Sequence, residues 1–274
     1  MKFCHIVPVD YIPEHSGDFV MALANYLEPD KANAYEEAML KSGLPIVLDN
    51  GAFETGKPDG IDNLFRKAKR IKPKYIFAPD TLFNAEQTRR GFENFEYIKE
   101  KMGHSFKTAV VVQADNIEEY LAEFKKYNED PRVSVIGLSY LAISQSMKYK
   151  NKKAVPKKST FDVFKHTNFT GDRIEMLKKI ADLKLEKVKP LHLLGLGESY
   201  EDVKIATASY GGYCLYNDTS TCYMASKKGI VFDGSLTITG GKIREKIDIK
   251  DEKSNLVEGL LKTNIKKVKE NICK

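Results

Sequence analysis

The stretch at residues 216–229 reads Tyr-Asn-Asp-Thr-Ser-Thr-Cys-Tyr-Met-Ala-Ser-Lys-Lys-Gly and follows a short apolar run at residues 212–216. The run has the composition of a buried β-strand, so Asp218 is predicted to lie where a strand ends and a loop begins. Barrels built from alternating strands and helices keep their catalytic residues at this end of each strand. A strand-terminal Asp also commonly caps the following helix, so the stretch alone leaves a structural and a functional role open.

Seven more apolar runs precede this strand, and most of the stretches between them have the pattern of helices. The runs lie at residues 3–7, 19–27, 45–48, 75–78, 108–112, 133–136 and 191–194, and helices are predicted at residues 31–40, 85–102, 117–127, 172–183 and from residue 199. Such alternation indicates a parallel sheet, and eight strands are the number that closes a (β/α)8 TIM-like barrel. Only about ten residues separate the first two runs, too few for a crossover helix, so we expect the first strand to pair in another way.

The C-terminal segment is predicted to be an appendage of one barrel domain that spans residues 1–274. Residues 230–249 alternate between apolar and polar types and contain Gly240 and Gly241, which favours a small hairpin. A lysine-rich amphipathic helix is predicted at residues 255–271. Its apolar stripe is expected to pack against the barrel and comprises Leu256, Leu260, Ile265 and Val268.

The composition favours a globular protein of a reducing compartment. Apolar residues make up 42% and charged residues 30%, no window reaches the length of a membrane span, and no signal peptide is expected. The cysteines are scattered without C-x-x-C spacing, which predicts neither a disulfide framework nor a zinc site and makes the cytoplasm the expected location. They are Cys4, Cys214, Cys222 and Cys273.

The charge of the chain favours a polyanionic partner, because the formal net charge is +6 and the pI is near 8.8. Residues 148–158 carry six lysines and no acidic residue, which is typical either of a solvated loop or of a loop that contacts phosphates. These lysines are Lys148, Lys150, Lys152, Lys153, Lys157 and Lys158, and a second cationic pair is Lys227 and Lys228.

Polar residues and glycines follow most of the predicted strands. Parallel strands of a closed barrel end on the same face, so these residues are expected to converge on one pocket. They are Asp49, Asn50, Asp80, Gln113, Gly137, Ser139, Gly195, Gly197 and Asp218. Each has a simpler explanation as a helix cap, a backbone partner or a turn glycine, and only the assembly favours a functional site. His192, in Leu-His-Leu-Leu, is predicted to be an inner-barrel residue and not a ligand.

Two aspartates, Asp49 and Asp218, limit the chemistry of such a pocket. The sequence has no Cys and His residues at metal-ligand spacing, no nucleophile elbow and no Gly-x-Gly-x-x-Gly motif, so no metal and no cofactor are expected. Paired carboxylates suit displacement at an anomeric carbon, where one attacks C1′ and the other moves the proton of the departing group. Asp80 and Gln113 would then bind the Watson–Crick edge of a purine, and Phe53 would stack on the base.

Six short motifs occur in a fixed order along the chain. They are Asp-Asn-Gly-Ala-Phe-Glu at residues 49–54, Pro-Asp at 79–80, Val-Val-Gln at 111–113, Gly-Leu-Ser at 137–139, Leu-Leu-Gly-Leu-Gly at 193–197, and the segment in which Gly229 follows Asp218 by eleven residues. Each motif is short and degenerate. In their order and spacing they resemble the tRNA-guanine transglycosylase superfamily, and most closely its zinc-free, phage-type branch of 7-deazaguanine DNA transglycosylases.

The resemblance implies an enzyme that exchanges guanine in a polynucleotide for a 7-deazaguanine, such as preQ0 or preQ1, through a covalent glycosyl-enzyme. It implies that Asp218 is the nucleophile on C1′ and that Asp49 is the general acid and base. The residues expected to bind or enclose the base are Asn50, Phe53, Asp80, Gln113, Gly137, Leu138, Ser139, Leu194 and Gly195.

Two departures from the family pattern bear on the polynucleotide. The family's Pro-Thr-Arg and second Arg are replaced by Cys-Tyr-Met at residues 222–224 and by Lys227 and Lys228, and the C-terminal zinc cluster is missing. The zinc-free chain is more similar to the DNA-modifying branch, so DNA is the expected partner and tRNA the alternative. The lysines at residues 148–158, with Lys227 and Lys228, are expected to contact its phosphates.

Other functions stay open on the sequence alone. The same two aspartates, Asp49 and Asp218, would serve a nucleoside or glycoside hydrolase, which uses water as the acceptor. A catalytically silent nucleic-acid-binding subunit on the same barrel is a further alternative, and a homodimer is one oligomeric state that the sequence leaves open. A guanine or 7-deazaguanine base is the expected small-molecule partner, no membrane partner is expected, and the location of a phage-encoded protein would be the host cytoplasm.

Overall fold

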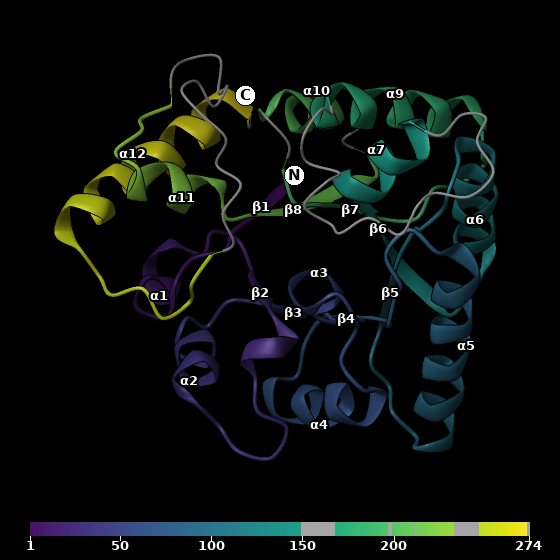
Figure 1. Cartoon of the computed structure of the whole chain (residues 1–274), viewed down its shortest axis with the longest axis horizontal. Helices are drawn as coiled ribbons and strands as arrows, with labels where there is room; N and C mark the ends of the chain where they lie inside the picture. Colours follow the sequence, from purple (N-terminus) through teal and green to yellow (C-terminus); the bar gives the residue numbers. More distant parts are fainter. Residues whose placement is uncertain (149–167, 197–198, 211, 233–246, 273–274) are drawn as a thin grey trace.

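The computed structural model describes residues 1–148, 168–196, 199–210, 212–232 and 247–272. Its eight strands form one sheet in which all paired neighbours run parallel, and helices surround that sheet (Figure 1). The predicted (β/α)8 TIM-like barrel is therefore confirmed, with one joint left unpaired. The strands are β1 (Lys2–His5), β2 (Val20–Ala22), β3 (Ile46–Leu48), β4 (Tyr75–Phe77), β5 (Thr108–Val111), β6 (Val133–Ser139), β7 (Leu191–Leu194) and β8 (Cys214–Thr219).

The unpaired joint lies between β1 and β2, which form the two ends of the sheet and have no strand ladder between them in the described residues. Residues 16–18, just ahead of β2, close this seam instead. His5 N donates to Ser16 O at 2.7 Å, and Asp18 N donates to Phe3 O at 2.7 Å. Phe3 N donates in turn to Asp18 Oδ2 at 2.8 Å. The first strand thus pairs with β8 and not with the run that follows it, as the short connection predicts.

Gly17 allows the two sides of the seam to approach each other. Its φ angle is +98°, and a Cβ at this position would lie 2.5 Å from Phe3 O. A side chain here would strain the backbone and push residues 16–18 away from β1.

Asparagine side chains mark the start of four helices. Each accepts a hydrogen bond from the backbone N–H three residues further on, which satisfies a donor that the first turn of a helix leaves free. These helices are α2 (Ala34–Lys41), α5 (Ala85–Lys101), α6 (Ile117–Glu129) and α9 (Phe169–Asp182), capped by Asn33, Asn84, Asn116 and Asn168. Helices were predicted in all four places.

Other helices complete the outer ring. They are α1 (Ile12–His15), α3 (Ala52–Thr55), α4 (Ile61–Ile71), α7 (Tyr140–Lys148), α10 (Glu201–Tyr210), α11 (Thr221–Lys227) and α12 (Asn255–Ile272), with short 3-10 turns at Val9–Tyr11 and Ala24–Tyr26. The sequence-based prediction missed α4 and α7, and it was wrong in placing a loop where α11 lies. None of the described helices is long and apolar enough to cross a bilayer.

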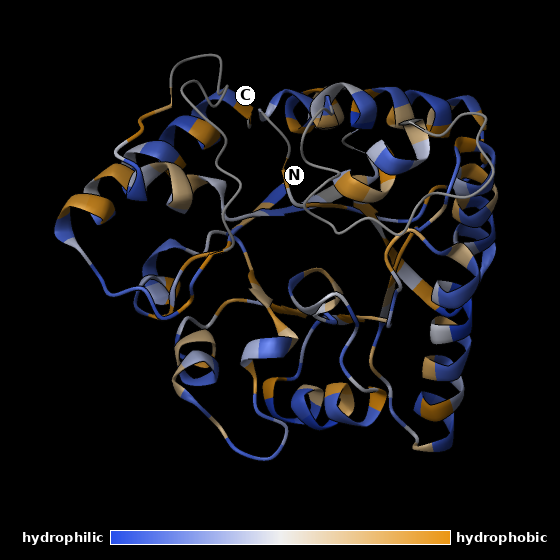
Figure 2. Cartoon of the chain, in the orientation of Figure 1, coloured by the Kyte–Doolittle hydropathy of each residue, from blue (hydrophilic) through white to orange (hydrophobic). Residues whose placement is uncertain are grey.

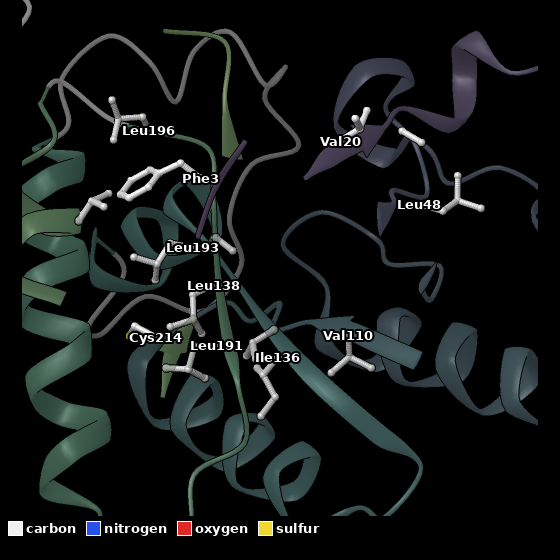
Figure 3. Close-up of a cluster of buried hydrophobic side chains, with 14 of the residues drawn as sticks. Phe3, Val20, Leu48, Val110, Ile136, Leu138, Leu191, Leu193, Leu196 and Cys214 are labelled. Carbon is white, nitrogen blue, oxygen red and sulfur yellow. The ribbon is translucent and has the colours of Figure 1, made fainter. Parts of the chain in front are cut away.

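Alternation along the strands sorts their side chains into two cores. The outer core lies between strands and helices and contains Phe3, Ile136, Leu138, Leu191 and Leu193 (Figure 3). The inner core fills the barrel and contains Cys4, Phe19, Tyr75, Phe77 and Tyr216. Apolar residues concentrate on the strands, whereas the helices carry both apolar and polar residues along their length (Figure 2). The parity of a residue within its strand therefore decides whether its side chain faces the barrel interior.

The C-terminal helix α12 packs on α11, and its buried face is Leu261, Asn264, Val268 and Ile272. The predicted stripe is right for Val268 but wrong for Leu256, which is 74% exposed. Asn264 holds the segment after α11 through bonds from Phe232 N to its Oδ1 and from its Nδ2 to Ile230 O. Most of the predicted hairpin, at residues 233–246, lies outside the described residues.

Candidate functional site

The polar residues predicted to form a site follow or end strands at one face of the barrel. Asp49 comes directly after β3, Asp80 three residues after β4, and Gln113 two residues after β5. Gly195 directly follows β7, and Asp218 is the fifth residue of β8. Because neighbouring strands are parallel, these positions share the carboxyl-terminal face, where barrel enzymes carry their catalytic groups.

Two side-chain amides hold the carboxylate of Asp80. Asn50 Nδ2 donates to Asp80 Oδ1 at 2.7 Å, and Gln113 Nε2 donates to Asp80 Oδ2 at 2.6 Å. Backbone groups orient both amides, since Ala52 N donates to Asn50 Oδ1 and Phe83 N donates to Gln113 Oε1. Each amide oxygen is engaged, so each NH₂ group must face Asp80. Asn50 and Gln113 were predicted to bind a base, and the structure uses their donors to position Asp80.

Asp80 itself is 4% exposed. Burial raises its pKa, and the hydrogen bonds from Asn50 and Gln113 offset part of that rise. Each carboxylate oxygen has a further lone pair, so Asp80 can still accept hydrogen bonds from N–H groups of a ligand. Asp80 does not cap the next helix, because α5 is capped by Asn84. The simpler explanation for Asp80, that of a helix cap, is therefore wrong.

Asp49 has a carboxyl group with a raised pKa. It keeps some surface exposed but is densely surrounded by protein, and Gly51 N donates to its Oδ2 at 3.0 Å. Burial raises its pKa well above the usual range, and the charges of Glu54, Asp80 and Asp218 raise it further. Asp49 and Asp218 are therefore within electrostatic reach of each other. A carboxyl group that holds its proton to a higher pH than usual is suited to act as a general acid.

Asp218 points into the barrel and contacts a histidine. His192 Nε2 lies 2.8 Å from Asp218 Oδ1, and His192 Nδ1 lies 2.8 Å from the hydroxyl of Tyr75. The contact with Asp218 has the distance of an ion pair but not the alignment of a hydrogen bond. On the neighbouring strand Cys4 is in register with Asp218, and burial followed by the charge of Asp218 raises the pKa of this thiol. Cys4 is therefore a neutral neighbour of the carboxylate.

A buried arginine fixes the backbone that follows β7. Arg173 on α9 pairs with Asp202 on α10, and its Nη1 and Nη2 donate to Leu194 O at 3.2 Å and Gly195 O at 3.0 Å. Gly195 has φ +67°, and a Cβ there would lie 2.4 Å from the ring of Tyr140. The predicted base-binding residues Leu194 and Gly195 are thus held by a cation that lies behind them.

Gly137 and Leu138 face opposite sides of β6. Leu138 is fully buried in the outer core, so its side chain faces the helices and only its backbone can contribute to the site (Figure 3). Gly137 faces the interior, where a Cβ would lie 2.8 Å from Leu194 Cδ1 and 2.9 Å from Phe77 Cε1. Ser139 Oγ accepts from Ala142 N at 3.5 Å, a capping contact at the start of α7.

Phe53 lies on the short helix α3, directly after the Asp49 loop, and is 37% exposed. An exposed aromatic ring beside a polar cluster offers a stacking surface for a planar ligand. Its placement is compatible with the predicted contact to a base.

The predicted phosphate contacts are placed only in part. Lys227 is the last residue of α11, and its Nζ donates to Asp251 Oδ2 at 2.6 Å, so its charge is offset within the chain. Lys228 is exposed. Lys148 ends α7. The remaining predicted contacts lie outside the described residues: Lys150, Lys152, Lys153, Lys157 and Lys158.

Metal-ligand chemistry has one candidate among the described residues, the group formed by Glu14, His15 and Glu258. Lys262 and Lys253 lie 2.9 Å and 3.5 Å from Glu258 Oε1, and the hydrogen bond from Lys262, helped by His15, lowers the pKa of Glu258 to about 2. Cations already satisfy this cluster, so we interpret it as an ion-pair network between α1 and α12.

A groove of about 390 Å³ lies at the opposite end of the barrel from Asp49, Asp80 and Asp218. Its lining includes Pro45 and Ile46 at the start of β3 and Lys74 just before β4. The candidate site and this groove are therefore separate.

Several partners in the site were not predicted. The interior position of His192 was expected, but its contacts with Asp218 and Tyr75 were not. The only signal in the sequence was the alternation of side chains along β7, which places His192 on the same face as Leu194, two residues further on. For Arg173 and Asp202, which lie within predicted helices, the sequence offered no signal of burial.

Comparison of the sequence with models of known protein families gives no match. Comparison with curated proteins gives no match either. The function has to be inferred from the geometry of the site, because a TIM-like barrel hosts many unrelated reactions.

Proposed function

We propose that this protein is a base-exchanging glycosyltransferase that replaces guanine in a nucleic acid with a 7-deazaguanine of the preQ0 or preQ1 type. DNA is the polynucleotide that we favour, and tRNA is the alternative. The observation that carries the proposal is the carboxyl pair of Asp49 and Asp218, which come from β3 and β8 at one face of the barrel, where the charge of Asp218 contributes to the raised pKa of Asp49. Two carboxyl groups in different surroundings can divide the roles of acid and nucleophile.

The surroundings of the two groups support this division of roles. Asp49 has a raised pKa, which favours the protonated form that a departing base requires. Asp218 has His192 beside Oδ1, while none of the described residues forms a hydrogen bond with its Oδ2. Asp218 would attack C1′ through an oxocarbenium-like transition state and form a glycosyl-enzyme, which the incoming base then resolves.

Asp80 supports recognition of a guanine edge. A carboxylate held by Asn50 and Gln113 presents acceptors to N1–H and to the exocyclic amine of the base. Guanine and 7-deazaguanines share this edge, so one site would accept first the departing base and then the incoming one. Phe53 would stack on either of them.

The nucleotide must leave its stack before it can react. C1′ and the Watson–Crick edge cannot both be reached within a duplex, so the base has to be flipped into the site. Phosphate contacts of exposed lysines such as Lys228 would help to hold the distorted strand, and binding should weaken as the salt concentration rises.

Three of the four cysteines lie in the described part of the chain, and they belong to no group of potential metal ligands there. Cys4, Cys214 and Cys222 are buried free thiols, and burial raises the pKa of Cys222 to about 12. Cys273 lies outside the described residues.

The proposal is tested by incubating the protein with radiolabelled guanine and, in separate reactions, with DNA and tRNA. We expect label in DNA, no label with Asp218→Ala, and a loss of about 100-fold to 10,000-fold with Asp49→Asn, the usual contribution of a general acid. Asp115→Asn, which removes an exposed carboxylate after β5, is the matched control and should keep full activity.

Three outcomes of this assay would decide against the proposal. Label in neither polynucleotide, or full activity of Asp218→Ala, would remove it. Release of free base without incorporation would identify a hydrolase that uses water as the acceptor. Label in tRNA alone would keep the reaction and correct the polynucleotide.

A further inference from the structure

A chain of three polar side chains crosses the interior of the barrel beneath the candidate site. The hydroxyl of Tyr75 on β4 lies 2.8 Å from His192 Nδ1 on β7, and His192 Nε2 lies 2.8 Å from Asp218 Oδ1 on β8. His192 is 0% exposed. Burying an imidazole inside an apolar barrel is unfavourable unless its nitrogens are satisfied, so this chain needs an explanation beyond packing.

Aromatic rings fix the plane of the imidazole. Ring centroids of Phe19, Phe77, Tyr75 and Tyr216 lie 5.6, 5.5, 6.2 and 5.8 Å from that of His192. Such a cage leaves little freedom for the ring to turn, so the atoms that His192 presents to its neighbours are set by the fold.

We assign the hydroxyl of Tyr75 as the donor to His192 Nδ1, because the carboxyl group of Asp218 beside Nε2 favours a hydrogen on that nitrogen. Burial raises the pKa of Tyr75 well above its usual value, so the phenol keeps its proton and can donate it to Nδ1. A neutral imidazole that accepts at Nδ1 carries its hydrogen on Nε2, which is the nitrogen beside Asp218 Oδ1. The N–H does not point at Oδ1 in the structure, and the contact requires the carboxylate to turn about its terminal torsion, which is broad for Asp.

We propose that His192 is a positioning residue for the nucleophile, a role that rests on the proposed base-exchange reaction. Once the two groups are aligned, its Nε2–H would hold Oδ1 of Asp218, which lies 2.8 Å away, and leave Oδ2 to attack C1′. Tyr75 acts one step further away by keeping that hydrogen on Nε2. The same contact makes Asp218 a better leaving group when the glycosyl-enzyme breaks down.

The two half-reactions show in which step the contact between His192 and Asp218 would stabilise charge. In the first, Asp218 Oδ2 forms a bond to C1′, the bond from C1′ to N9 breaks, and the departing base receives both electrons and the proton of Asp49. In the second, N9–H of the incoming base returns a proton to Asp49, N9 bonds to C1′, and the ester bond breaks with its electron pair on Asp218. Negative charge builds on the carboxylate only in the second step, where the Nε2–H of His192 stabilises it.

Loss of the donor should therefore slow breakdown of the glycosyl-enzyme and not its formation. His192→Phe fills the cage without a donor, and we expect kcat to fall by about 10-fold to 100-fold, the worth of one hydrogen bond to a charged group. The covalent protein–nucleic acid adduct should accumulate on a denaturing gel. His192→Gln, which keeps an amide donor, should restore much of the turnover and remove the adduct.

Two further variants separate this role from packing. Phe19→Leu disturbs the same cage without touching a polar group, so it should lower the melting temperature without accumulating adduct. Tyr75→Phe keeps the ring and removes only the hydroxyl, so it should accumulate adduct to a smaller extent than His192→Phe. If His192→Phe does not fold, the Tyr75→Phe variant still tests the role of His192.

The outcomes distinguish this inference from the reaction on which it rests. A wild-type protein that exchanges base, together with His192→Phe and Tyr75→Phe variants that show no more adduct than Phe19→Leu, would overturn the role of His192 alone. A wild-type protein that exchanges no base in DNA or tRNA would overturn the reaction and the role together.

Discussion

The raised pKa of Asp49, which suits the proposed role of a general acid, has a cost in stability. Burial and the nearby charges of Glu54, Asp80 and Asp218 raise its pKa from the ordinary value of 3.8. The stability that follows from binding this proton is complete below the unfolded pKa and is lost as the pH rises through the folded pKa. Above that range the folded protein carries a buried charge that the unfolded chain would expose to water.

Asp49→Asn should remove this loss, because an amide does not ionise. We expect the variant to gain stability relative to the wild type as the pH rises above about 4, by about 1.4 kcal/mol for each unit by which the pKa is raised. Urea denaturation across this pH range measures the difference. Asp10→Asn, at an exposed position, controls for loss of a surface charge. A difference from wild type that is the same at every pH would contradict the expectation.

The identity of the site residues could be predicted from the sequence better than their partners. Asp49, Asp80 and Asp218 stand at strand ends, and a closed parallel barrel must bring such positions to one face. Which donor satisfies which acceptor depends on side-chain geometry between distant strands. The sequence alone therefore could not indicate that Asn50 serves Asp80 or that His192 contacts Asp218.

At the scale of elements, the link between α9, α10 and the end of β7 is the most constrained in the site. Arg173 and Asp202 are both fully buried, and burial raises the pKa of Asp202 while Arg173 opposes that rise. Two helices and the backbone of Leu194 and Gly195 thus share one guanidinium group. Removing only one of the two paired charges is unfavourable, because the other charge then stays buried without water to solvate it.

Arg173→Met should destabilise the protein by about 3–5 kcal/mol, since it leaves the Asp202 carboxylate buried without a cation. The double variant Arg173→Met with Asp202→Leu removes both charges and should recover part of the loss. Base exchange should stay low in both, because Leu194 O and Gly195 O lose their donor. Denaturant unfolding measures the first effect and incorporation of label the second. Equal stability of the single and double variants would count against a buried ion pair.

Helices with clear boundaries could be predicted, and those that continue from a strand could not. β6 ends at Ser139 and α7 begins at Tyr140, while only Ser220 separates β8 from α11. No glycine or proline marks these boundaries, so the sequence pattern runs on without a break. For α4, in contrast, the sequence did contain a signal. Its buried residues Leu64, Phe65, Ala68 and Ile71 have helical spacing, so this helix could have been predicted.

At the scale of the whole molecule, the seam between β1 and β2 is the joint that the described residues close without a strand ladder. Backbone bonds from residues 16–18 take the place of a strand ladder, and they require Gly17 at φ +98°. Structures with few backbone bonds at a joint open there more readily than elsewhere.

Gly17→Ala should loosen this joint by a clash as well as by backbone strain. Gly43→Ala is the control for backbone strain alone, because Gly43 has φ +66° and no atom within 4 Å of the place where a Cβ would lie. We expect it to lower the free energy of unfolding by about 1 kcal/mol. We expect Gly17→Ala to lose about 3 kcal/mol and to exchange the amide hydrogens of Phe3 and Asp18 faster. Thermal unfolding and hydrogen exchange check both, and equal losses in the two variants would show that the clash with Phe3 O does not matter.

The seam also lies between the two carboxyl groups to which the proposed reaction assigns the catalytic roles. Asp218 belongs to β8, the neighbour of β1, and Asp49 follows β3, the neighbour of β2, so each group stands one strand away from the joint on its own side. Enzymes that retain configuration keep such groups about 5 to 5.5 Å apart. In the proposed reaction, opening of the seam would therefore change the distance between the proposed acid, Asp49, and the proposed nucleophile, Asp218, and with it the space for the sugar.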